Sequence, residues 1–73
     1  MAHHRLTWAS FNVRSIYGRG ETITEFMVQH QISVLALQET FERANDPPVG
    51  LPRSTYSKPS ENARRGVMII VNP

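Results

Sequence analysis

The segment formed by residues 34–40 (VLALQET) constrains the fold more than any other part of the sequence. It begins with four apolar residues and ends with three polar residues, Gln38, Glu39 and Thr40. A short apolar run without polar alternation is typical of a strand covered on both faces, as in a parallel sheet. Because burying an unpaired carboxylate is costly, the charged residue at the end of this strand, Glu39, requires an explanation.

Two interpretations of Glu39 follow from its position. Ligands of open α/β sheets bind just beyond the carboxyl ends of parallel strands. Glu39 is therefore a candidate metal or ligand contact. The alternative is a strand-end residue that faces solvent or pairs with Arg43.

A strand and a helix are expected before this segment. Residues 6–13 (LTWASFNV) carry apolar side chains on both alternating faces, which predicts a strand buried on both sides. Residues 21–30 show the apolar spacing of an amphipathic helix, with Ile23, Phe26 and Met27 in one stripe. The order strand, helix, strand with short links predicts a βαβ unit with parallel strands and a right-handed crossover.

The first strand also ends on a polar residue, Asn12. If the two strands are neighbours, their carboxyl ends lie side by side about 5 Å apart. Asn12 and Glu39 would then both be able to reach one ion or one bound water. The alternative interpretation of Asn12 is a residue that turns the chain by bonding to its own backbone.

The second half of the chain has a different composition. Residues 41–62 contain four of the five prolines, which predicts a long loop with a short strand near residues 54–57. Residues 66–72 (GVMIIVN) are rich in β-branched side chains and predict a last strand, buried if it pairs with the others. The basic residues of this half are scattered, and a contact with nucleic acid is one use for them.

Composition limits the class of protein. With 73 residues the chain is one domain or a piece of one, and a domain of about 60 residues is only marginally stable. It contains no cysteine, which excludes disulfides and thiolate chemistry. The formal charge is +2, and seven of the eight basic residues are Arg, the side chain suited to bidentate phosphate contacts.

The sequence gives no sign of membrane insertion or secretion. No apolar run approaches the roughly 20 residues that a membrane span needs. The amino-terminal segment MAHHRLTW lacks the charged and then apolar pattern of a signal peptide. We therefore expect a nuclear or cytoplasmic protein that is not secreted and has no membrane partner.

Three segments together resemble a known family. These are FNVRS (residues 11–15), LALQET (residues 35–40) and RGVMIIV (residues 65–71). In this order they resemble the amino-terminal third of the endonuclease/exonuclease/phosphatase superfamily of metal-dependent phosphoesterases. Within it, the combination of NVRS and LQET looks most like the endonuclease domains of non-long-terminal-repeat retroelements, with the apurinic-site endonucleases as a close second.

The resemblance implies a fold, a cofactor and two site residues. The family fold is a four-layered α/β sandwich. Glu39 matches the family's metal-binding glutamate, and Asn12 matches the asparagine that helps to hold the metal and the scissile phosphate; both therefore stand as catalytic and metal-site residues. Mg²⁺, with Mn²⁺ as an alternative, would neutralise the charge that builds up during phosphodiester cleavage. The expected partner is nucleic acid, DNA more than RNA.

The chain also departs from the family. The family's catalytic Tyr, Asp-x-Asn pair and closing Asp-His are not present in the 73 residues, so the general base is not in this chain. We therefore expect residues 1–73 to be a partial domain that is inactive by itself and whose partner is the carboxyl-terminal part of its own domain. Two alternatives stay open. One is a phosphatase of the same superfamily acting on inositol phosphates or sphingolipids, and the other is a non-enzymatic remnant.

Overall fold

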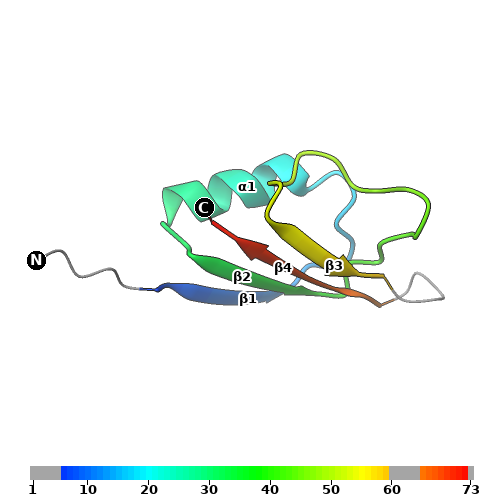
Figure 1. The fold of residues 1–73 in the computed structure, drawn as a ribbon, viewed down its shortest axis with the longest axis horizontal. Coiled ribbons are helices and arrows are strands. Elements are labelled where there is room, and N and C mark those ends of the chain that lie inside the picture. Colours follow the sequence, from blue (N-terminus) through cyan, green and yellow to red (C-terminus); the bar gives the residue numbers. More distant parts are fainter. Residues whose placement is uncertain (1–5, 60–64, 73) are drawn as a thin grey trace, which may run out of the picture.

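The computed structural model describes residues 6–59 and 65–72 as one helix packed on a four-stranded sheet (Figure 1). The elements are β1 (Trp8–Asn12), α1 (Gly20–Gln29), β2 (Val34–Gln38), β3 (Thr55–Lys58) and β4 (Val67–Val71). The expected helix and all four expected strands are therefore present, with ends that shift by one or two residues. The α/β class predicted from the sequence is confirmed.

The sheet is mixed, with the strand order β1-β2-β4-β3. β1 and β2 are parallel neighbours, as the βαβ pattern predicts, and β4 runs antiparallel to both β2 and β3. In this register Gln38 lies between Asn12 on one side and Val67 on the other. The carboxyl ends of β1 and β2 and the amino end of β4 therefore meet at one edge of the sheet.

The hydrophobic core lies between the sheet and α1. The sheet contributes Leu35, Leu37, Met68 and Ile70, and these pack with Ile16, Met27 and Ile32, all at most 3% exposed. Burial alternates along β2 and β4, as expected of strands that bury one face.

The expectation that the strands are covered on both faces is wrong for the described part of the chain. Trp8 is 69% exposed and Ile69 is 46% exposed, although both belong to strands rich in apolar residues. The physical reason is that the described residues contain only one helix to cover the sheet. α1 lies along one face of the sheet, and residues 6–59 and 65–72 place no second layer on the other face (Figure 1). The described residues therefore form two layers.

The loop between β2 and β3 packs against the start of α1. The Thr24 hydroxyl donates a hydrogen bond to the Gly50 carbonyl (2.9 Å), and the Tyr17 hydroxyl donates one to the Asp46 carbonyl (2.7 Å). These contacts hold the Pro-rich segment close to the helix that precedes β2. Within the described ranges, α1 is too short and too polar to cross a membrane.

Candidate functional site

Asn12 and Glu39 come together at the edge where β1 and β2 end. The side-chain amide of Asn12 donates a hydrogen bond from Nδ2 to Oε2 of Glu39. Asn12 is thus not engaged in the local turn that was its alternative interpretation. Glu39 does not pair with Arg43, because Arg43 forms its ion pair with Asp46 at 3.1 Å. The other alternative for Glu39, a residue that faces solvent, stays open because Glu39 is partly exposed.

The backbone around Glu39 is held from both sides. On the β1 side, Ser15 N–H donates to the Glu39 carbonyl (2.8 Å) and Ile16 N–H to the Thr40 carbonyl (2.8 Å). On the β4 side, Thr40 N–H donates to the Gly66 carbonyl (3.3 Å). The position of Glu39 is therefore fixed by main-chain hydrogen bonds to both neighbouring segments.

Glu39 also adopts an unusual backbone conformation. Its φ is +54°, in the left-handed region that non-glycine residues rarely occupy. Arg14 and Ser15, which face it across the edge, have φ values of +51° and +100°. Strained backbone of this kind costs on the order of 1–3 kcal/mol per residue and clusters at functional sites. The concentration of such residues at this edge marks it as the candidate site.

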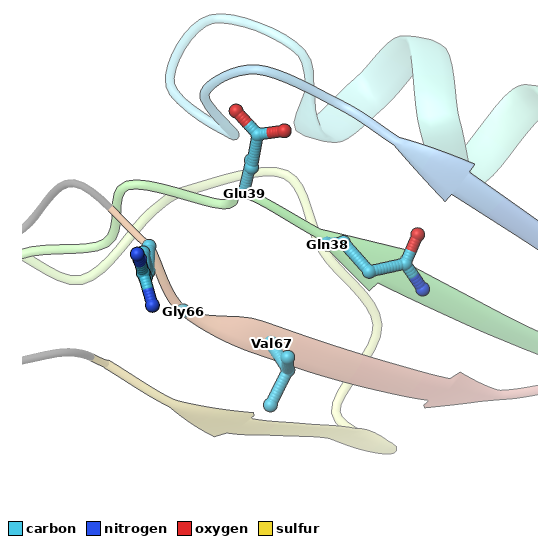
Figure 2. A pocket seen from close by; sticks show the side chains of 5 residues that line it. Gln38, Glu39, Gly66 and Val67 are labelled. Carbon is cyan, nitrogen blue, oxygen red and sulfur yellow. The ribbon is translucent and has the colours of Figure 1, made fainter.

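A hollow of about 450 Å³ opens beside Glu39. It is lined by Gln38, Glu39, Arg65, Gly66 and Val67. Figure 2 shows Glu39 directly after β2, with its carboxylate turned toward the loop that follows β1. The Gln38 side chain is held by a hydrogen bond from Nε2 to the Ser10 hydroxyl (3.0 Å). The residues that line the hollow therefore include one that carries a carboxylate, one that carries an amide and one that carries a guanidinium.

Arg65 is the residue of this site that sequence reasoning missed. It counted only as one of several scattered basic residues, because it lies 26 positions after Glu39 in the chain. The signal that could have found it is its place directly before the Gly-Val start of the last strand. Once that strand pairs with β2, the residues before it lie next to Glu39.

The oxygen atoms of Asn12 and Glu39 decide which metal ions these two residues could hold. The hydrogen bond between Asn12 and Glu39 leaves Asn12 Oδ1 and Glu39 Oε1 as further oxygen donors. Mg²⁺ commonly binds through one or two carboxylates and keeps several waters or substrate phosphate oxygens. Within the described ranges, no three His, Cys, Asp or Glu side chains gather as a metal-binding group. Asn12 and Glu39 are thus residues whose side-chain oxygens are of the type that a hard cation prefers.

A second carboxylate after β2, Glu42, is not part of this set. It is 7% exposed and accepts a hydrogen bond from the Ser57 hydroxyl of β3 (3.3 Å). It does not line the hollow beside Glu39. The site thus has one carboxylate from this loop.

Comparison with known protein families, with curated proteins and with solved structures found no match to this chain. The family resemblance therefore rests on the quoted sequence segments. The geometry at the edge of the sheet comes from the structure.

Proposed function

We propose that Asn12 and Glu39 belong to the site of a Mg²⁺-dependent phosphodiesterase that cleaves nucleic acid. The observation that carries this proposal is the hydrogen bond from Asn12 Nδ2 to Glu39 Oε2 at the ends of two parallel strands. It gives the edge of the sheet one oriented carboxylate. Ligands of α/β proteins bind at this kind of edge.

Each residue has a distinct part in the proposed chemistry. Mg²⁺, or Mn²⁺ in its place, would neutralise negative charge on the phosphate and on the leaving oxygen. Glu39 supplies the carboxylate that holds the cation. Asn12 fixes the orientation of that carboxylate through a neutral amide, so the site keeps the full negative charge of Glu39.

Two features support a larger domain built on the same plan. The outer face of the sheet exposes apolar side chains such as Trp8 and Ile69, which a second sheet of a four-layered sandwich would cover. The quoted segments resemble only the amino-terminal third of the family. We therefore propose that this chain is the front part of an endonuclease domain of the retroelement or apurinic type and is inactive by itself.

Metal binding by the 73-residue chain tests the role of Glu39. In a titration with Mn²⁺ followed by NMR, we expect paramagnetic broadening of the Asn12 side-chain amide and of the backbone signals around Glu39. Glu39→Gln should weaken Mn²⁺ binding by at least about tenfold, since loss of even a supporting residue of a metal site costs about 10–100-fold in affinity. Glu25→Gln on the exposed side of α1 removes the same charge and is the matched control.

The results of these experiments distinguish a metal-binding Glu39 in a nuclease from the alternatives. Equal Mn²⁺ binding by the wild type and by Glu39→Gln would contradict the assignment of Glu39. In a completed parent domain, Glu39→Gln should abolish Mg²⁺-dependent nicking of DNA while the fold is retained. Hydrolysis of inositol phosphates or sphingolipids by the parent, without nicking, would favour the phosphatase alternative.

A further inference from the structure

Arg65 lies next to Glu39 because the main chain places it there. β2 and β4 pair antiparallel with Gln38 opposite Val67, so continuing the pairing by one residue brings Gly66 opposite Glu39. The Phe41 N–H donates a hydrogen bond to the Arg65 carbonyl (2.9 Å), which extends the contact past the end of the strands. The backbone of Arg65, and with it the position of its Cα atom, is therefore fixed relative to the candidate metal site.

Two residues of opposite charge, Glu39 and Arg65, line the hollow without forming an ion pair with each other. Arg65 and Glu39 line the same 450 Å³ space, yet among the described residues the one ion pair is Arg43–Asp46. The guanidinium of Arg65 is therefore not neutralised by the carboxylate of Glu39. A carboxylate residue and an arginine that line one space suit an anion that contacts the arginine directly and reaches the carboxylate through a cation.

Gly66 lines the same hollow as Glu39 and Arg65. Its φ is +113°, a conformation that side-chain-bearing residues rarely adopt. A side chain at this position would therefore be strained. The local sequence Arg-Gly thus supplies a cation and a residue that tolerates this backbone conformation.

From this geometry we infer that Arg65 binds a non-bridging oxygen of the phosphodiester group of a nucleic-acid strand. The inference rests on the proposed function, because the anion would lie between Arg65 and the cation held by Glu39. Arg forms short, charge-assisted and often bidentate hydrogen bonds to phosphate. Arg65 is exposed at the edge of the sheet, so an unbroken nucleic-acid strand has access to its side chain.

The test compares variants of the 73-residue chain that carry the same charge. Arg65→Ala and Arg53→Ala both lower the formal charge of +2 by one. Arg53 is exposed in the turn before β3, near the carboxyl end of β4 and thus at the opposite end of the sheet from Gly66. The probes are thymidylyl-thymidine, which has one phosphodiester, thymidine, which has none, and inositol monophosphate, titrated by NMR with and without Mg²⁺.

We expect thymidylyl-thymidine to shift the backbone signals around Arg65 and Glu39 and thymidine not to. Arg65→Ala should weaken dinucleotide binding by about tenfold or more, the effect of losing a charge-assisted hydrogen bond. Arg65→Lys should restore part of the affinity, and Arg53→Ala should change it less than about twofold. Unchanged amide spectra of the free variants will show that the fold is intact.

The two proposals fail in different ways. If Arg65→Ala binds the dinucleotide like the wild type while Glu39→Gln loses Mn²⁺, the inference about Arg65 is overturned and the metal site stands. If Arg65→Ala loses the dinucleotide while Glu39→Gln keeps Mn²⁺, the proposed function fails and Arg65 remains a phosphodiester contact. Binding of inositol monophosphate that is tighter than that of the dinucleotide would overturn the assignment to nucleic acid.

Discussion

Asn12 donates a side-chain hydrogen bond to the carboxylate of Glu39, a residue 27 positions further along the chain. The contact is a direct result of topology. β1 and β2 are parallel neighbours with Asn12 opposite Gln38, so Glu39 is the first residue beyond the paired strands. An amide at the end of one strand can therefore orient a carboxylate at the end of the next. This pair forms the centre of the proposed metal site.

The backbone conformation of Glu39 should cost stability. With φ at +54°, Glu39 is in a region that is strained for L-residues and free of strain for glycine. We expect Glu39→Gly to raise the free energy of unfolding by about 1 kcal/mol relative to Glu39→Ala. Both variants remove the carboxylate and its hydrogen bond, so the difference isolates the backbone. Urea denaturation followed by circular dichroism measures it.

Both variants should also lose Mn²⁺ binding, whichever is more stable. A more stable protein without metal affinity is the pattern expected when a strained residue is retained for its side chain. Equal stability of the Gly and Ala variants would mean that the left-handed conformation of Glu39 carries no strain.

The proximity of Asn12 and Glu39 could be predicted from the sequence. An amphipathic helix between two apolar segments predicts a βαβ unit, and such a unit aligns the carboxyl ends of its strands. The strand expected within residues 34–40 is present as β2, Val34–Gln38, and α1 lies within a residue of its expected limits. Local periodicity was sufficient because both elements are short and separated by short links.

Two features could not be predicted, for different physical reasons. The exposed face of the sheet was missed because the pattern of apolar residues reports what a strand can bury, not whether a second layer covers it. Arg65 was missed because its place beside Glu39 depends on β4 pairing antiparallel with β2 across a long loop. Strand order and direction of that kind are set by contacts distant in sequence.

Shortening the side chains of two neighbouring residues of β4 should lower the stability of the protein to different extents. Ile70 is fully buried between the sheet and α1, whereas Ile69 is 46% exposed on the opposite face. We expect Ile70→Ala to cost about 2–5 kcal/mol, because it leaves a cavity in the core. Ile69→Ala should cost less than about 1 kcal/mol, because part of that side chain is already in contact with water. Thermal and urea denaturation of the two variants provide the comparison.

An equal loss of stability in both variants would show that the outer face is covered in solution. Repeating the denaturation at lower protein concentration then identifies what covers the outer face of the sheet. Dependence of the Ile69→Ala effect on protein concentration would mean that a second copy of the chain packs on this face, whereas an effect independent of concentration would place another segment of the same chain there.

Thr40, which follows Glu39, offers a test of what holds the proposed metal site in place. It is fully buried, and its hydroxyl has no hydrogen-bond partner among the described residues. Val has nearly the same shape without the polar group, so we expect Thr40→Val to stabilise the protein by about 1 kcal/mol. Thr24→Val is the matched control. It should cost about 1 kcal/mol, because the Thr24 hydroxyl donates to the Gly20 and Gly50 carbonyls.

The same variant should leave Mn²⁺ binding unchanged. The main chain of Thr40 makes the hydrogen bonds to Ile16 and Gly66 that hold this loop, and these bonds do not involve the side chain. If Thr40→Val instead weakens Mn²⁺ binding while the protein becomes more stable, the buried hydroxyl contributes to the site. Loss of stability in Thr40→Val would show that the hydroxyl has a hydrogen-bond partner in solution.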